Sequence, residues 1–108
     1  MKQGDKIFFA CLKQQGIPLP TTEHKFHEGR KWRMDYAWID NKIALEVEGG
    51  VWTGGRHTRG QGFINDCEKY SEAAIAGWCV IRVTPQQLTD LNTMNMLKRA
   101  FKNRGEKI

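Results

Sequence analysis

The hydrophobic positions of this chain follow helical spacing near its start and strand-like spacing further along. In segment 3–15 they recur every three to four residues, and a glycine and a proline then end the pattern. Segments 22–27, 32–39 and 43–48 follow the two-residue period of strands, with turn-forming residues between them. The first part of the chain is therefore predicted to contain one helix followed by three strands.

The strands 32–39 and 43–48 should pair as a β-hairpin, because the segment 40–42 between them has tight-turn chemistry. One face of the first strand should carry its large hydrophobic residues: Trp32, Met34, Tyr36 and Trp38. We assign the aromatic ones among them to the core together with Trp78. The acidic residues Asp35, Glu46 and Glu48 should share the polar face of the hairpin.

The second half begins with a glycine-rich segment, 49–62, which is typical of a loop that approaches a ligand closely. A helix over 63–76, a buried strand over 78–83 and a last helix over 85–102 follow. The last helix should bury four hydrophobic residues: Leu88, Leu91, Met94 and Leu97. The order α-β-β-β-α-β-α predicts an α/β fold, with a single domain over 1–108 and a mixed central sheet flanked by helices.

Composition indicates a soluble protein with a polyanionic partner. The chain has 108 residues, a net charge of +5 and a mean hydropathy of -0.60, and no apolar run approaches a membrane span. The positive charge favours nucleic acid, although a soluble protein with a basic tail fits the same charge. The three cysteines form no metal or disulfide motif, so a reducing cytoplasm is the simplest location.

The acidic residues of the hairpin carry the chemistry. If Asp35, Glu46 and Glu48 converge, they repel one another strongly unless a cation neutralises them. Carboxylate oxygens suit Mg²⁺ first and Mn²⁺ second. The alternative is a solvent-exposed polar face that merely alternates. Nearby cations, and a helix with Asp66, Lys69 and Tyr70 at i, i+3 and i+4 on one face, favour a centre for phosphoryl transfer.

These residues resemble a known family. Segments 33–35 and 46–48 read Arg-Met-Asp and Glu-Val-Glu, which resembles the core of the PD-(D/E)XK nuclease superfamily. The longer run over 43–57 is similar to small phage and prophage endonucleases of that superfamily, including VRR-NUC and very-short-patch-repair-like nucleases. The resemblance extends over about residues 21–90 and implies a restriction-endonuclease-like fold.

The resemblance also implies metal-dependent hydrolysis of DNA phosphodiester bonds. Asp35 and Glu46 would bind Mg²⁺, which Mn²⁺ would replace, and the backbone carbonyl of Val47 would add a further oxygen. The third motif position, usually lysine, is Glu48 here. Glu48 would bind the metal directly, bind it through water, or position the attacking water. Lys69 is the candidate to replace the motif lysine by orienting water or stabilising charge on phosphorus.

Further residues are candidates for supporting roles. His57 would act as general acid or base, or as a hydrogen-bond donor to phosphate. Asp66 would hold His57 or Lys69, unless it is simply a surface acid, and Glu23 resembles an acid that some relatives place near the metal. Trp52 would stack on a base or anchor its loop. The candidate DNA-binding residues are Arg30, Lys31, Arg33, Trp52, Arg56, Arg59, Lys98, Arg99 and Lys102.

The sequence thus predicts a Mg²⁺-dependent endodeoxyribonuclease of phage or prophage replication, recombination or repair, acting in the host cytoplasm. Junctions and flaps are candidate substrates, and cutting both strands would need a homodimer. One alternative is a catalytically silent DNA-binding module of the same fold, which Glu48 in place of lysine favours. Another is a partner protein whose basic tail contacts an acidic protein.

Overall fold

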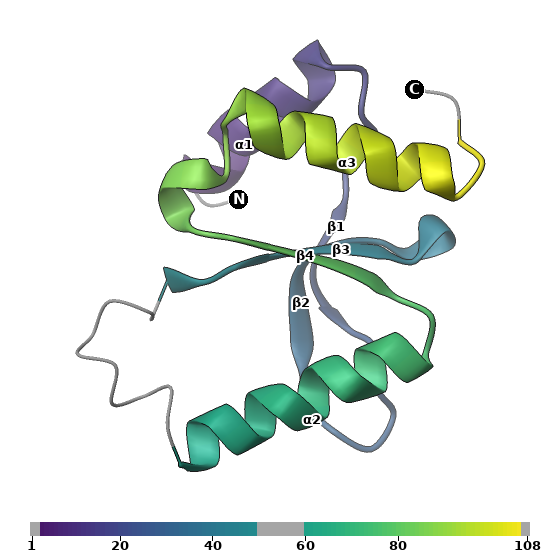
Figure 1. Ribbon diagram of the computed structural model, residues 1–108. Coiled ribbons are helices and arrows are strands. Elements are labelled where there is room, and N and C mark those ends of the chain that lie inside the picture. The colour runs from purple at the N-terminus through teal and green to yellow at the C-terminus, as the bar shows by residue number, and fades with distance from the viewer. Residues whose placement is uncertain (1–2, 50–59, 107–108) are drawn as a thin grey trace.

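The computed structural model describes residues 3–49 and 60–106 (Figure 1). In chain order, its elements are helix α1 (Gln3–Gln14), strands β1 (Thr21–Lys25) and β2 (Arg33–Trp38), the short 3₁₀ helix η1 (Ile39–Asn41), strand β3 (Ile43–Val47), helix α2 (Gln61–Ile75), strand β4 (Cys79–Val83), the short 3₁₀ helix η4 (Pro85–Gln87) and helix α3 (Leu91–Asn103). The predicted order of helices and strands is confirmed.

The four strands form one mixed sheet in the order β1-β2-β3-β4. β1 pairs with β2 and β2 with β3 in antiparallel fashion, whereas β3 and β4 are parallel. Tyr36 lies opposite Leu45 and Trp38 opposite Ile43, which confirms the predicted hairpin. Helix α2 makes the crossover that a parallel pair requires.

Helices cover both faces of the sheet: α1 and α3 pack on one side and α2 on the other (Figure 1). The larger core contains residues from α1, the segment after it, β2, β3, β4 and α3: Phe8, Leu12, Ile17, Tyr36, Trp38, Ile43, Leu45, Val83, Met94, Leu97, Ala100 and Phe101. The smaller core contains residues of β2, β3 and α2 and the residue before β4: Met34, Ala37, Ala44, Ala73 and Trp78.

The prediction that Trp32, Met34, Tyr36 and Trp38 share one face is wrong. Met34 belongs to the smaller core and Tyr36 and Trp38 to the larger one. Trp32 is half-buried and precedes β2, so it is not a core residue. The alternation changes at Asp35, where the backbone N–H donates to the carboxylate of Glu46. The Glu46 side chain takes the place of the backbone acceptor of a regular strand pairing, so β2 is irregular at Asp35.

The single last helix predicted over 85–102 is divided into η4 and α3. Thr84 and Gln87 cap η4 reciprocally, as in a capping box. The Thr93 hydroxyl donates to the backbone carbonyl of Gln87 over 2.6 Å and so links the first turn of α3 to the end of η4. As a result Thr93 is buried, and Leu91, expected to point inward, is 62% exposed.

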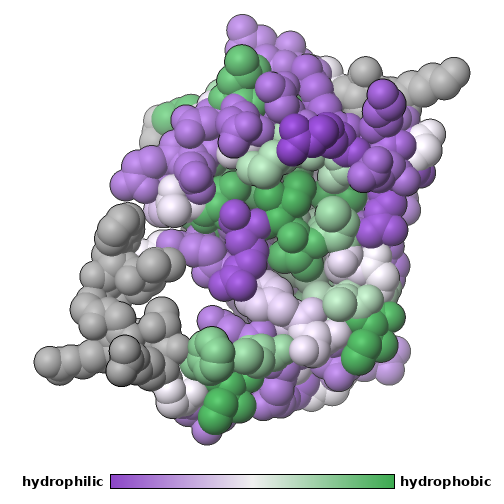
Figure 2. All heavy atoms as spheres, viewed as in Figure 1, coloured by the Kyte–Doolittle hydropathy of each residue, from purple (hydrophilic) through white to green (hydrophobic). Residues whose placement is uncertain are grey.

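The edge strand β4 contributes hydrophobic surface. Cys79, Val80 and Ile81 are half-buried, and Figure 2 shows hydrophobic side chains in the middle of this face, below the largely hydrophilic surface of α3. Within residues 3–49 and 60–106, no helix has the length and apolar character needed to cross a membrane.

Candidate active site

Asp35 and Glu46 are linked where the β2–β3 pairing ends. The backbone N–H of Asp35 donates to Glu46 Oε2 over 2.8 Å, and the backbone N–H of Val47 donates to Asp35 Oδ2, also over 2.8 Å. The last backbone pair before them joins Tyr36 to Leu45. Each carboxylate is therefore fixed by the main chain of the other strand, and charge-assisted bonds of this kind are strong.

Glu46 is a buried charge with a partner. It is only 3% exposed, and its Oε1 forms an ion pair with Lys69 of α2 and accepts a hydrogen bond from the Tyr70 hydroxyl over 3.3 Å. Burial raises the pKa of Glu46, although the hydrogen bond from Lys69 and the Asp35 N–H oppose that rise. The alternative of a merely solvent-exposed polar face is therefore wrong for this residue.

Glu48 belongs to the same network through Tyr70 and Arg82. Its Oε1 lies 3.2 Å from the Tyr70 hydroxyl and accepts a 2.6 Å hydrogen bond from Arg82 Nε. The Arg82 guanidinium lies 4.3 Å from the centre of the Tyr70 ring. Burial, followed by the charges of Glu46 and Glu48, raises the pKa of Tyr70, so its hydroxyl stays a donor. The one hydroxyl proton of Tyr70 is shared between the carboxylates of Glu46 and Glu48.

On the α1 side, Asp35 lines an acidic pocket of about 430 Å³. The Tyr36 hydroxyl donates to Asp5 Oδ1 in this pocket over 2.6 Å, and burial together with that bond raises the pKa of Tyr36. The lining residues come from α1, β1, β2 and β3 and from the segment after η4: Asp5, Thr22, Glu23, Asp35, Tyr36, Val47 and Leu88. The pocket therefore gathers three carboxylates around one side of the hairpin.

Glu23 is conformationally unusual. Its φ of 53° lies in the left-handed region, which costs energy for a residue with a Cβ. The residues on either side, Thr22 and His24, pair with Tyr36 and Met34, so Glu23 occupies the β1 position nearest Asp35. Glu23, the acid that the sequence suggested as a further residue near the metal, thus lies in the same pocket as Asp35.

The predicted site of three converging carboxylates is not formed among residues 3–49 and 60–106, where no group of three His, Cys, Asp or Glu side chains is close enough to hold a metal. The donor chemistry still fits Mg²⁺, which proteins often bind through one or two carboxylates with water completing the shell. Asp35 and Glu46 supply two such carboxylates. Within the described ranges both oxygens of Glu46 accept hydrogen bonds, whereas Asp35 accepts one through Oδ2 alone.

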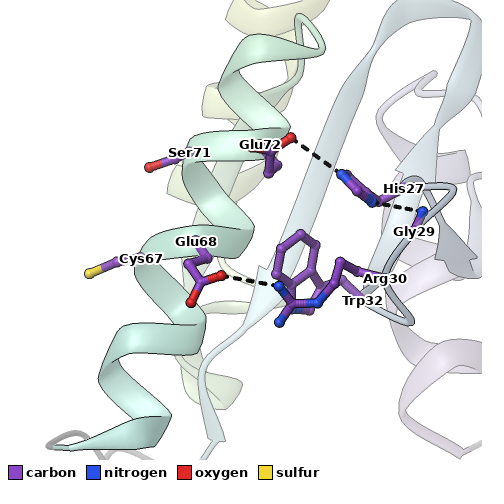
Figure 3. Close-up of a pocket in the computed structure, with 8 residues that line it drawn as sticks. All are labelled: His27, Gly29, Arg30, Trp32, Cys67, Glu68, Ser71 and Glu72. Atoms are coloured by element: carbon purple, nitrogen blue, oxygen red, sulfur yellow. Dashed lines mark hydrogen bonds and ion pairs between the residues drawn. The ribbon is translucent and has the colours of Figure 1, made fainter.

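Arg30, a candidate DNA contact, lies in a different place, a groove of about 470 Å³ between α2 and the β1–β2 loop (Figure 3). It forms an ion pair with Glu68 at 3.1 Å and lies 4.0 Å above the ring of Trp32. In the same groove, His27 is hydrogen-bonded to Glu72 over 3.3 Å. The groove contains none of the residues predicted to be catalytic.

The other predicted residues are scattered. Lys31, Arg33 and Asp66 are exposed, and Lys98 donates to Gln15, the residue after α1. The basic residues of α3 lie on the opposite side of the sheet from Lys69: Lys98, Arg99 and Lys102. Four candidates lie outside the described residues: Trp52, Arg56, His57 and Arg59.

Sequence reasoning did not assign roles to Tyr70, Arg82 or Asp5. Tyr70 follows Lys69 directly on the helix, which was a usable signal. Arg82 lies opposite Glu46 in the parallel β3–β4 register. That neighbour can be identified only once the pairing across the α2 crossover is known, because the two residues are far apart in sequence.

Comparison with models of known protein families finds no match for this sequence. Two uncharacterized proteins, from two strains of Mycobacterium tuberculosis, are each 29% identical to it over 70 residues. The match includes 63% of this chain but 24% of each relative, so the chain spans about a quarter of their length.

Among solved structures, the catalytic domain of the homing endonuclease I-Bth0305I has a similar fold. The two superpose with a TM-score of 0.66 and 17% sequence identity, over 96% of this chain and 98% of that domain. At this identity the likeness concerns the arrangement of helices and strands. Residues 3–49 and 60–106 therefore have an α/β fold like that of an endonuclease catalytic domain.

Proposed function

We propose that this protein is a metal-dependent endodeoxyribonuclease of the PD-(D/E)XK type. The observation that carries the proposal is the pair of linked carboxylates, Asp35 and Glu46, with the ammonium of Lys69 against the buried one. A buried carboxylate with a raised pKa, beside a second acid and a cation, is typical of catalytic centres. The similarity of the fold to an endonuclease catalytic domain supports the same reading.

In this proposal Asp35 and Glu46 hold the metal, with the Val47 carbonyl as a third donor. When bound, Mg²⁺ or Mn²⁺ would supply polarisation of the scissile phosphate and a lower pKa of the metal-bound water. Lys69 places a positive charge where negative charge develops on the phosphate oxygens. Tyr70, protonated because its pKa is raised, keeps Glu46 and Glu48 within reach of one hydroxyl.

Glu23 has a supporting role in the same proposal. It lines the pocket of Asp35, and its left-handed backbone is the kind of local strain that functional sites retain. Glu23 would add negative charge on the α1 side of Asp35 and help to attract the cation. Asp5, in the same pocket, accepts the hydrogen bond of the Tyr36 hydroxyl.

The test is nicking of supercoiled plasmid with Mg²⁺, with Mn²⁺ and with excess EDTA. We expect nicking with either metal and none with EDTA. Labelled junction, flap, nicked and linear DNAs would then identify the preferred structure, including the substrates of phage replication, recombination or repair. One domain with one site should cut one strand per engagement, and paired cuts would indicate a dimer.

A catalytically silent DNA-binding module is the second candidate. It is favoured by the absence of a three-ligand group in residues 3–49 and 60–106, and by the ion pairs that already neutralise Glu46 and Glu48. DNA binding without nicking on any of the substrates and metals would establish this function in place of the nuclease.

A further inference from the structure

Arg82 differs from the other well-placed arginines in what its guanidinium contacts. Within the described ranges, its only hydrogen bond runs from Nε to Glu48, so its two terminal nitrogens have no acceptor there. By contrast, a terminal nitrogen of Arg30 is paired with Glu68, and a terminal nitrogen of Arg104 donates to the carbonyls of Lys42 and Gly77. The Arg82 side chain is also 48% exposed.

The position of Arg82 is fixed beside the candidate catalytic residues. It is paired with Glu46 in the parallel register of β3 and β4, so both side chains lie on the α2 side of the sheet. The Tyr70 ring, 4.3 Å away, supports the guanidinium, and Glu48 holds its Nε over 2.6 Å. Two contacts therefore orient the group, and its terminal nitrogens have no acceptor among residues 3–49 and 60–106.

The charged groups around Arg82 leave its guanidinium able to bind an anion. Glu48 is the one acid hydrogen-bonded to Arg82 in the described part of the chain, and Asp66 acts on it at longer range from α2. Lys69, next to Tyr70, is already paired with Glu46. The two terminal nitrogens of a guanidinium lie in one plane and match the two non-bridging oxygens of a phosphodiester, which they bind bidentately.

We propose that Arg82 binds a backbone phosphate of the DNA substrate through its terminal nitrogens, while Glu48 and Tyr70 hold the guanidinium in place. The ligand is a phosphodiester of a DNA strand, so this contact fixes the position of the strand and does not read its sequence. The proposal rests on DNA being the substrate and deepens the proposed function by giving the strand a contact next to Glu46.

The first test measures DNA affinity without catalysis. Binding of a fluorescent duplex is followed by anisotropy in EDTA, over a series of salt concentrations, for the wild type, Arg82→Gln and Arg82→Lys. Lys13→Gln is the control, because it removes one positive charge from an exposed position of α1. Circular dichroism and thermal unfolding verify that each variant is folded.

Arg82→Gln should bind about tenfold more weakly, the loss expected for a charge-assisted hydrogen-bonded contact. The slope of log affinity against log salt should fall by about 0.9, or one phosphate contact. Arg82→Lys should keep the slope but lose several-fold in affinity, because an ammonium lacks the fork. Wild-type affinity in both Arg82 variants, or no wild-type binding even at low salt, would overturn the proposal. An equal loss in Lys13→Gln would also overturn it, by showing a general charge effect.

A double-mutant cycle separates phosphate binding from mere positioning of Glu48. If Arg82 binds phosphate, Arg82→Gln still weakens DNA binding in a Glu48→Gln background, although less than in the wild type, because Glu48 helps to hold the guanidinium. If it acts only by holding Glu48, the loss disappears in that background and the proposal fails. Because these measurements are made in EDTA, they stand apart from the nicking assay: loss of binding in Arg82→Gln with no wild-type nicking would reject the nuclease and retain the phosphate contact.

Discussion

The two faces of the sheet differ in what they bury. On the α1 and α3 side, large hydrophobic side chains such as Phe8, Leu97 and Phe101 are almost wholly excluded from water. On the α2 side, the hydrophobic cluster is small and includes three alanines. Beyond it lie Glu46 and its partners from α2. One face therefore supplies most of the hydrophobic stabilisation, and the other accommodates charges.

This difference has an energetic reason. A buried carboxylate costs several kcal/mol unless a charge and hydrogen bonds compensate it, and even a good ion pair often does no better than hydrophobic residues would. The buried ion pair of Glu46 is therefore not expected to raise the free energy of unfolding much. A fold that places such a group on one face needs a well-packed opposite face, and the larger core provides it.

The largest expected effect comes from removing a carboxylate on the charged face. Glu46→Gln should lower nicking by roughly a thousandfold, since a metal ligand is lost. The fold should persist, because the amide has nearly the same size and can still accept the N–H of Asp35. Plasmid nicking with Mg²⁺ measures the loss, with Glu28→Gln, an exposed loop acid, as control. Full nicking by Glu46→Gln would refute the site assignment.

On the hydrophobic face, truncation should affect stability and not chemistry. Leu97→Ala should lower the free energy of unfolding by about 3 kcal/mol, because it leaves a cavity in the larger core. Nicking measured well below the melting temperature should match the wild type. Denaturant unfolding gives the first quantity. A loss of nicking in fully folded Leu97→Ala protein would show that the two faces are not separable.

Lys69→Gln should affect turnover and its pH dependence. Turnover should fall by roughly a hundredfold, as when a donor to the developing negative charge is removed, with a smaller change in DNA affinity. Burial raises the pKa of Glu46 and Lys69 opposes that rise, so the pKa should be higher still in the variant. A deprotonated Glu46 is needed to bind metal, and the rise of rate with pH should therefore occur at higher pH.

The same shift predicts how stability depends on pH. A carboxyl group whose pKa is raised by folding favours the native state below its unfolded-state pKa, and this contribution is lost as pH rises through the native pKa. The window of loss should thus reach to higher pH in Lys69→Gln than in the wild type. Rate and unfolding profiles that superpose for the two proteins would contradict the coupling between Lys69 and Glu46.

The smallest effect is expected in the groove of Figure 3, where ion pairs are partly exposed. Glu68→Gln breaks the ion pair with Arg30. The Arg30 side chain is 41% exposed and the Glu68 side chain is 48% exposed. The free energy of unfolding should change by less than about 1 kcal/mol, because water already screens such pairs. Thermal unfolding and nicking together check this. A change as large as that of Leu97→Ala would mean that the groove holds α2 onto the sheet.

Sequence patterns predicted the order of elements and the hairpin because alternation and turn chemistry are local properties. The same alternation, followed through Asp35, placed Met34 on the wrong face, since the backbone there bonds to the Glu46 carboxylate and not to a partner strand. The division of the last helix depends in the same way on a side chain, the Thr93 hydroxyl, which bonds a backbone carbonyl.

For the candidate site, the sequence indicated which charged residues to consider but not how they are arranged. Asp35 and Glu46 are neighbours because a hairpin brings its two strands together. Arg82 and Glu48 meet only through parallel pairing across α2, which no local pattern reveals. Nor does composition show that Asp35 opens onto an acidic pocket on the α1 side while Glu46 faces α2.

At Glu23 the backbone of β1 has a left-handed conformation, to which glycine is better suited than glutamate. Glycine would adopt this φ without the cost of roughly 1–2 kcal/mol that a Cβ brings. It would also empty one acidic position of the Asp35 pocket. The chain thus retains a locally unfavourable amino acid, as proteins do where activity and thermostability compete, and engineering for heat resistance would meet that conflict first at this strand.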